Sequence, residues 1–311
     1  MRSNVTFKSN DLKLAGHLYL PDDYKKGEKC PAIVVSHPFT GVKEQTAGLY
    51  AKKLSEKGFI TLAFDASYQG ESEGEPRYLE DPFARAEDIK SAVSFLESRD
   101  EVDEQGIGAM GICASGGYVP FAAQTDRRIK AAATVSGVDL GDFFRKGLPS
   151  STFPNVGPNL EHLLEESGKA RTEEAKGQPP RLKHIVPNTP EELPKGSPLF
   201  FREAIDYYRT PRGQHPNSTN LFLLKSVDQI AEYSSYDHVD MISPRPLLMI
   251  AGTNADTRFF SEMAIEKAEP KELFLIDGAT HIALYDKKEY VDPAVEKMNS
   301  FFRQYLQSAN K

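Results

Sequence analysis

The chain has 311 residues, of which 39% are hydrophobic and 27% are charged, and its formal net charge at pH 7 is −7. This composition is typical of a globular protein and excludes a generally disordered one. The acidic balance, without a block of Lys and Arg, does not favour a nucleic-acid or anionic-membrane partner. The two cysteines, Cys30 and Cys113, are too few for a disulfide framework and lack the spacing of a metal site.

The N-terminal stretch lacks the apolar segment of a secretory signal, and no region approaches the roughly 18 apolar residues of a membrane span. We therefore expect a cytoplasmic protein without a membrane partner. The length of the chain fits one large domain or a domain with a sizeable insertion.

The first part of the chain predicts a hairpin followed by a parallel sheet. Apolar and polar residues alternate over 5–21 around an Asn-Asp turn signal, which is typical of a solvated hairpin. Continuous apolar runs follow at 32–37 and 59–66, separated by a helical pattern at 50–58. Continuous apolar strands that alternate with amphipathic helices indicate an α/β protein whose mostly parallel sheet has helices on both faces.

The same alternation continues along the chain, stops, and then resumes. We expect strands at 106–112, 129–137, 245–252 and 271–278, and helices at 82–98, directly after Tyr118, near 258–268 and at 292–307. Residues 141–243, where the alternation stops, are rich in Pro and Gly but keep Phe, Leu and Tyr throughout, which favours a folded insertion. We therefore predict an α/β core of residues 1–140 and 244–311, with a cap or lid insertion at 141–243.

The stretch GAMGICASGGY, residues 108–118, predicts a nucleophile at a tight turn between a strand and a helix. At such an elbow the attacking side chain sits on a strained turn, and the residues two positions away must be small. Cys113 is flanked in this way by Gly111 and Ser115, and Ser115 is flanked by Cys113 and Gly117. Cys113 is the better candidate. A nucleophilic Ser115 would lengthen the strand by two residues and make the next helix start later, although that helix must end at residues 126–128. Ser115 is the alternative nucleophile, and a buried, inert Cys113 is the alternative without catalysis.

A base and an acid should follow the nucleophile in this type of sheet. Each of the last two predicted strands is followed by a suitable residue, first Asp256 and then His281. His281 would take the proton of Cys113, and Asp256 would orient and stabilise the imidazole. Asp240 and Asp277 compete with Asp256 for the acid role.

Backbone N–H groups near the nucleophile are expected to bind the developing oxyanion. One is the N–H of Ala114, at the start of the helix that follows the elbow. The second should come from Phe39 or Thr40, in the loop after the strand at 32–37. His37 would shape that loop by an orienting hydrogen bond, with a role as a second base left open.

Two motifs resemble those of a known superfamily. The run IGAMGICASGG resembles the I-G-x-x-G-x-nucleophile-x-G-G run of α/β-hydrolases and places the nucleophile on Cys113, although Ser115 stands where the common pattern has Gly. FDASYQGESEGEP resembles their D-x-x-G-x-G-x-S loop, with Asp65, Gly70 and Ser72 matching. The chain is thus similar to the α/β-hydrolase superfamily, near its dienelactone-hydrolase-like branch, and to bacterial hydrolases related to fungal polyketide transferases.

This resemblance implies an α/β-hydrolase fold and a hydrolase that acts on an ester, lactone or thioester of a small molecule. The reaction would pass through an acyl-enzyme on Cys113, resolved by water or, in an acyltransferase, by another acceptor. No cofactor or metal is implied, and Asp65 would support the site. A non-catalytic binding protein of the same fold is the alternative, but the ordered set of Cys113, Asp256 and His281 favours an enzyme. Aromatic pieces of the insertion would line the pocket or form a homodimer surface.

Overall fold

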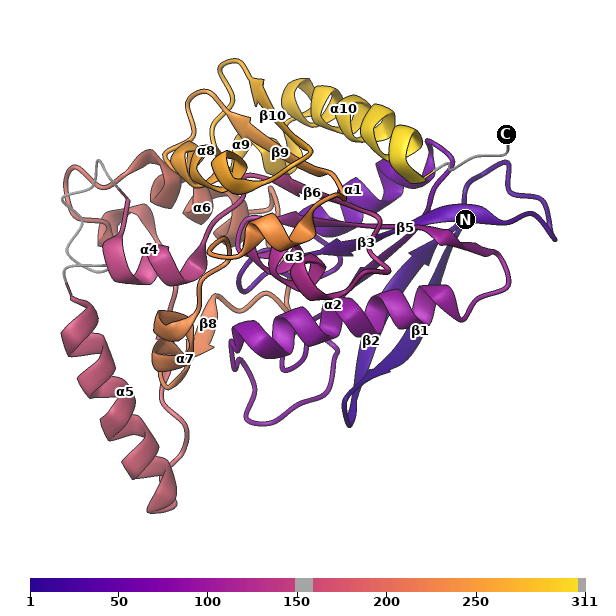
Figure 1. The fold of residues 1–311 in the computed structure, drawn as a ribbon. Helices are drawn as coiled ribbons and strands as arrows, with labels where there is room; N and C mark the ends of the chain where they lie inside the picture. The colour runs from indigo at the N-terminus through magenta and orange to yellow at the C-terminus, as the bar shows by residue number, and fades with distance from the viewer. Residues whose placement is uncertain (149–158, 307–311) are drawn as a thin grey trace.

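A single mixed sheet forms the centre of the protein (Figure 1). The computed structural model describes residues 1–148 and 159–306, and within them eight strands follow the order β1-β2-β4-β3-β5-β6-β9-β10. The strands are β1 (Arg2–Ser9), β2 (Leu12–Tyr19), β3 (Cys30–Ser36), β4 (Ile60–Phe64), β5 (Val102–Ile112), β6 (Ala131–Val135), β9 (Leu247–Gly252) and β10 (Lys271–Ile276). β1, β2 and β4 pair antiparallel, and all pairs from β4 to β10 are parallel.

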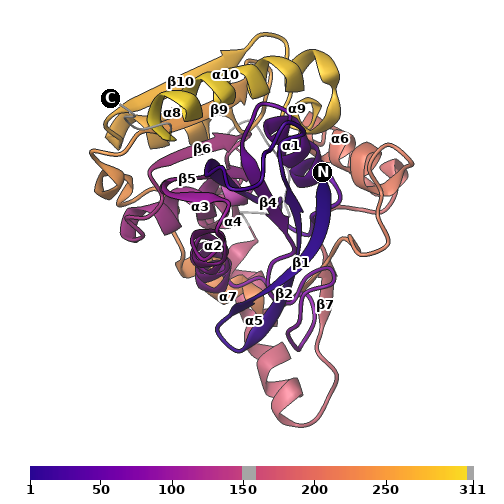
Figure 2. The same ribbon diagram turned by 90° about the vertical axis from the view of Figure 1, so that its right-hand side faces the viewer.

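Helices cover both faces of this sheet (Figures 1 and 2). They are α1 (Thr46–Ser55) and α10 (Lys288–Leu306) on one face, and α2 (Pro82–Glu97), α3 (Ser115–Thr125) and α8 (Arg258–Lys267) on the other. Every residue of β4, β6 and β9 is buried, as expected for strands covered on both faces. The predicted α/β architecture with a mostly parallel sheet is confirmed.

The start of α2 shows how local sequence sets these boundaries. The carboxylate of Asp81 accepts hydrogen bonds from the N–H groups of Phe83 and Ala84, and Pro82 occupies the first turn. An acidic cap and a proline at the first helical position are both favourable at a helix N-terminus. The predicted start of this helix at residue 82 therefore has a local cause.

Between β6 and β9 the chain leaves the sheet and forms a separate group of short elements. These are α4 (Leu140–Lys146), α5 (Leu160–Ala175), β7 (Leu182–His184), η1 (Pro190–Glu192), α6 (Leu199–Arg209), β8 (Leu221–Leu223), α7 (Ser226–Glu232) and η2 (Val239–Ile242). β7 and β8 form an antiparallel pair, and α5 extends away from the rest of the molecule (Figures 1 and 2). The predicted insertion 141–243 includes residues 149–158, which lie outside the described residues.

The closing part of the chain adds α9 (Ala283–Asp286) before α10. In the part of the chain that the structure describes, no helix is both long enough and apolar enough to span a bilayer.

Candidate active site

The turn between β5 and α3 holds Cys113 in a strained backbone conformation. Its φ is +57°, a backbone angle that residues other than glycine rarely adopt. The turn is fixed on both sides, since the Cys113 N–H donates to the carbonyl of Val135 at 3.1 Å and its carbonyl accepts from Gly116 at 2.8 Å. A Cβ at Gly111 would lie 1.8 Å from the carbonyl oxygen of Ser115. Only glycine fits there, so the chain can turn sharply enough to present Cys113.

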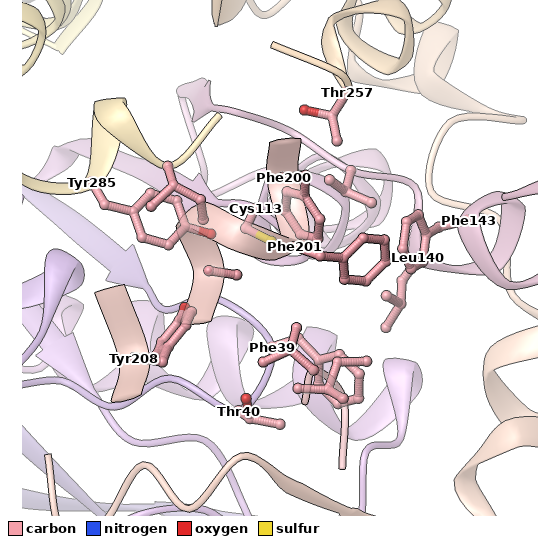
Figure 3. A pocket seen from close by; sticks show the side chains of 15 residues that line it. Phe39, Thr40, Cys113, Leu140, Phe143, Phe200, Phe201, Tyr208, Thr257 and Tyr285 are labelled. Atoms are coloured by element: carbon pink, nitrogen blue, oxygen red, sulfur yellow. The ribbon is translucent and has the colours of Figure 1, made fainter. Parts of the chain in front are cut away.

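The sulfur of Cys113 lies among hydrogen-bond donors at the edge of an apolar cavity (Figure 3). Burial raises the pKa of the thiol, and hydrogen bonds with the hydroxyl of Tyr285 and the backbone N–H groups of Ala114 and Phe39 oppose that effect. The sequence predicts two oxyanion donors, Ala114 and either Phe39 or Thr40, and the N–H groups that meet the sulfur are those of Ala114 and Phe39. Thr40 also lines the cavity, and its carbonyl accepts a hydrogen bond from Ser218 at 2.8 Å.

The cavity in front of Cys113 has a volume of about 50 Å³ and lies between the sheet and the inserted elements. One wall comes from the loops after β3, β5, β6, β9 and β10, and the other from α4, α6 and the residues after β7. Phe143, Phe200 and Phe201 surround the space opposite the sulfur (Figure 3). Among the described residues that line it there is no Asp, Glu, Lys or Arg, so the cavity favours an uncharged, apolar group.

A second and larger space adjoins this cavity. It has a volume of about 380 Å³, and Ile185, Val186 and Phe201 line both spaces. Lys183, His184 and Glu192 also lie on its wall. The shared residues therefore separate a small apolar chamber at the sulfur from a larger one with a partly polar lining.

His281 lies beside the cavity with both ring nitrogens engaged. Its Nδ1 is 2.6 Å from the Thr257 hydroxyl, and its Nε2 is 3.2 Å from the Tyr285 hydroxyl. The ring stands edge-on to Phe200, with 4.8 Å between the ring centroids. Because the imidazole is buried, its pKa is lowered to about 3, and it is neutral at physiological pH.

The structure places Asp256 differently from the predicted triad. Its Oδ2 accepts a hydrogen bond from the N–H of Phe200 at 3.1 Å, in the first turn of α6. Asp256 and His281 line one small gap, but within the described residues no hydrogen bond joins them; the next residue, Thr257, contacts the imidazole instead. The carboxylate thus caps a helix of the insertion, a favourable position for a negative charge.

Ser115, the alternative nucleophile, points away from the cavity into a buried polar network. Its hydroxyl donates to the carbonyl of His37, lies 2.9 Å from the hydroxyl of Ser36, and accepts from the Arg85 guanidinium at 2.9 Å. Ser115 is fully buried and does not line the cavity. The two candidate side chains therefore lie on opposite sides of the elbow.

The guanidinium of Arg85 is the centre of that network. It donates to the carbonyl of His37 at 2.7 Å, lies 3.8 Å from the carboxylate of Glu80, and sits over the ring of Tyr118. Glu80 is completely buried, and its carboxylate accepts a hydrogen bond from Tyr118 at 2.8 Å. A buried charge pair with these contacts ties α2 to the strand ends behind Cys113.

The side chain of His37 supports the loop that carries Phe39. Its Nδ1 is 2.7 Å from the carbonyl of Pro38, and its Nε2 accepts from the N–H of Ala66 at 3.1 Å. Burial and the nearby Arg85 lower the pKa of His37 well below the usual value, so the ring is neutral. These contacts match the orienting hydrogen bond considered from the sequence.

Asp65 ties the same loop to the loop after β4. Its carboxylate accepts from the N–H of Lys43 at 2.8 Å, from the Lys43 ammonium at 2.7 Å and from the N–H of Glu71 at 2.9 Å. Among the described residues, the group of acids close enough to hold a metal ion is Glu44, Asp65 and Glu71. The Lys43 ammonium contacts all three at 2.7 Å and supplies the positive charge there.

Sequence reasoning missed Thr257, Tyr285 and Arg85. Tyr285 lies four residues after His281, a spacing that brings side chains together on a helical turn, and this signal was available. Thr257 follows the predicted acid directly but carries no charge to mark it. Arg85 lies within an amphipathic helix, where a charged residue is ordinarily solvent-exposed.

The sheet order, the strained cysteine between β5 and α3 and the histidine after the last strand define the protein as an α/β-hydrolase, an enzyme class. The sequence profile of the X-Pro dipeptidyl-peptidase (S15 family) matches residues 10–204, and the chain belongs to this family. The predicted membership of the α/β-hydrolase superfamily is thereby confirmed.

Relatives extend over the whole chain. The protein YcjY of Escherichia coli (strain K12) is 39% identical over 313 residues, covering 98% of this chain and 100% of that one. The crystal structure of PA2218 from Pseudomonas aeruginosa has a TM-score of 0.89 at 37% identity and covers 98% of this chain and 94% of that chain. A more distant relative, the thiohydrolase aneE of Aspergillus aculeatus, is 29% identical and covers 80% of this chain and 75% of that protein.

Proposed function

We propose that this α/β-hydrolase cleaves an ester, lactone or thioester of a small molecule through a covalent acyl-enzyme on Cys113. The proposal rests on one observation above all, the strained Cys113 whose sulfur meets the N–H groups of Phe39 and Ala114 in an apolar cavity. A thiol at that position can attack a carbonyl carbon whose oxygen binds the same N–H groups. The relative named thiohydrolase supports thioesters as one substrate class.

The reaction would proceed in two displacements. His281 takes the thiol proton, and the sulfur forms a bond to the carbonyl carbon while the carbonyl electrons move to the oxygen, which Phe39 and Ala114 hold. When the tetrahedral intermediate collapses, the bond to the leaving group breaks and the leaving alcohol or thiol takes the proton from His281. Water, activated by the neutral imidazole, then cleaves the thioester of Cys113 and releases the acid.

Ser115 has a structural role in this proposal. An attacking hydroxyl must reach both a base and the substrate, whereas the Ser115 hydroxyl is enclosed between Ser36, His37 and Arg85. The thiol of Cys113 is therefore the nucleophile that the proposal assigns.

The group that orients the imidazole is Thr257 in this proposal. Its hydroxyl oxygen accepts a hydrogen bond from Nδ1–H, which leaves the lone pair of Nε2 directed toward Tyr285 and the thiol side of the cavity. Asp256, the acid predicted from the sequence, contributes by capping α6 and holding Phe200 against the imidazole.

The substrate should carry an apolar acyl group, because the chamber at the sulfur has aromatic and aliphatic walls. A chain too long for about 50 Å³ would pass Val186 and Phe201 into the larger chamber. Residues 141–243 thus act as a cap that sets acyl-chain length. The described residues that line the small chamber include no carboxylate, so a substrate ammonium group there would lack an ionic partner.

Trapping the acyl-enzyme tests the proposal. The protein is mixed with p-nitrophenyl butanoate or a butanoyl thioester, quenched in acid and digested, and the peptide that holds residues 106–125 is mapped by mass spectrometry. We expect one butanoyl group on Cys113, removed by hydroxylamine at neutral pH as a thioester is. Cys113→Ala should remain unlabelled, and Ser115→Ala should be labelled like the wild type.

An acyl group on Ser115 would overturn the assignment of the nucleophile. No acyl-enzyme and no turnover of any ester or thioester in folded protein would overturn the proposed function itself. Adding an alcohol or amine acceptor and analysing the products separates hydrolysis from acyl transfer.

A further inference from the structure

The hydroxyl of Tyr285 lies between the thiol and the imidazole of the proposed site. It is 3.2 Å from His281 Nε2 and also forms a hydrogen bond with the thiol of Cys113. Tyr285 is 1% exposed, its side chain lines the cavity, and its hydroxyl faces the sulfur (Figure 3). Within the described residues no hydrogen bond joins the thiol directly to His281, whereas Tyr285 contacts both groups.

The hydrogen bonds around His281 determine in which direction protons can move. The Thr257 hydroxyl lies 2.6 Å from Nδ1, and a proton on Nδ1 that donates to it leaves Nε2 as an acceptor. The Tyr285 hydroxyl can then donate to Nε2, which leaves its oxygen available to accept from the thiol. Once the thiol has lost its proton, the Tyr285 hydroxyl donates to the thiolate, and this hydrogen bond lowers the pKa of the thiol.

From this arrangement we infer that Tyr285 is a further catalytic residue, a relay that carries the proton of Cys113 to His281. This inference rests on the proposed function. In the relay step the S–H bond of Cys113 breaks and its proton passes to the Tyr285 oxygen. The original Tyr285 proton passes to Nε2 at the same time. Tyr285 ends neutral, Cys113 is a thiolate and His281 is an imidazolium, so no proton is gained or lost.

The surroundings of the sulfur favour formation of the thiolate. The thiolate forms where the N–H groups of Phe39 and Ala114 already meet the sulfur, so the oxyanion site stabilises it before substrate enters. Burial raises the pKa of the thiol and lowers that of His281, which keeps both groups neutral at rest. The other titratable groups packed on Tyr285 are Tyr207 and Tyr208 of α6. Burial raises the pKa of both phenols, so both stay protonated.

A proton inventory tests the relay on the unmodified enzyme. The acylation rate with p-nitrophenyl butanoate is measured in mixtures of H₂O and D₂O. Two protons that move together give a curved dependence on the deuterium fraction, and one proton gives a straight line. We expect curvature for the wild type. A straight line would overturn the inference.

A pair of tyrosine variants sharpens the test. Tyr285→Phe removes the hydroxyl but keeps the ring, whose centroid lies 5.2 Å from that of Tyr207. The fold should therefore survive. We expect kcat/KM to fall about 100-fold, as for loss of a proton-transfer group, and the remaining inventory to be linear. Tyr207→Phe is the matched control, because Tyr207 does not line the cavity at Cys113. It should retain wild-type rates and curvature.

The outcomes separate the relay from its alternatives. If Tyr285→Phe reacts with iodoacetamide faster than the wild type, the tyrosine restrains the thiol and the inference is wrong. If it keeps full acylation rates, the thiol reaches His281 without help and the inference is also wrong. Labelling of Cys113 in both cases would leave the proposed function standing, whereas absence of labelling in the wild type would remove the proposed function first.

Discussion

The two sides of the elbow in this hydrolase differ sharply in chemistry although their key residues are two positions apart. On the pocket side, Cys113 faces an apolar cavity, with Tyr285 as a polar neighbour that in turn contacts His281. On the buried side, Ser115 and Arg85 belong to a network whose hydrogen bonds join α2, α3 and the end of β3. A reactive group needs a site where it can gain and lose a proton, whereas a supporting network is stabilised by the hydrogen bonds among its buried members. A single turn of the chain therefore separates the reactive side chain from the residues that support it.

The largest expected effect comes from removing the reactive group on the pocket side. Cys113→Ala should lower kcat/KM for p-nitrophenyl esters on the order of 1,000-fold or more, because among the described residues that line the cavity Cys113 carries the only thiol. Thermal unfolding should change little, since the side chain loses one atom. Ser115→Ala, measured alongside, should keep most activity. Equal activity of Cys113→Ala and wild type would erase the contrast between the two sides.

The corresponding change on the buried side should affect stability more than chemistry. Arg85→Met leaves the buried carboxylate of Glu80 without its cation and removes the donor to Ser115. We expect the free energy of unfolding in urea to fall by about 3 kcal/mol. The double variant with Glu80→Gln should recover part of the loss because no buried charge remains. A loss below about 1 kcal/mol would mean that the network is not a main support of the elbow.

The partner of the imidazole is tested by two neighbouring substitutions. Thr257→Val removes the group 2.6 Å from Nδ1 and should lower kcat about 100-fold, because the imidazole loses its orientation. Asp256→Asn keeps an oxygen to accept from Phe200 and should change kcat about twofold or less. The opposite ranking in steady-state assays would favour the carboxylate predicted from the sequence.

A smaller effect is expected on substrate choice. Val186→Trp would fill the boundary between the two chambers and should lower kcat/KM for dodecanoyl esters about 10-fold relative to acetyl esters. Leu182→Trp is a suitable control, since Leu182 is 45% exposed and lines neither chamber. An unchanged ratio for a series of chain lengths in the Val186 variant would show that the acyl chain takes another route.

The smallest change is expected with pH. Burial lowers the pKa of His281 to about 3 and raises that of the Cys113 thiol, so imidazole and thiol both keep their neutral, competent forms across the neutral range. Activity should therefore fall on acidification only as the pH approaches the pKa of His281, where the imidazole takes up a proton. We expect kcat/KM to vary less than about twofold between pH 5.5 and 8, whereas an exposed histidine would titrate near 6.5. An acid limb near pH 6.5 would show that the imidazole is hydrated in the working enzyme.

Much of the site was predictable because its signals are local. The small residues around Cys113 mark a strained turn, and Gly111 has no room for a Cβ. Continuous apolar runs mark strands whose ends meet at one edge of a parallel sheet, which brings His281 and Phe39 near the elbow.

Other contacts depend on how distant loops pack. The loop after β9 could present either Asp256 or Thr257 to the imidazole, and its course beside α6 turns the carboxylate toward the helix. Arg85 pairs with Glu80 inside the protein although both residue types are ordinarily found at the surface. Periodicity places a residue on a helix face but does not tell which buried partner meets it.

Local sequence patterns specify the order of strands and helices, the sharp turn at Cys113 and the place of His281 after the last strand, because hydrophobic periodicity and small residues act over a few positions. The inward direction of Ser115, the contact of Thr257 with the imidazole and the place of Tyr285 between imidazole and thiol follow from tertiary packing. Those outcomes depend on side-chain directions where segments far apart in the chain pack together, and no local pattern encodes such directions.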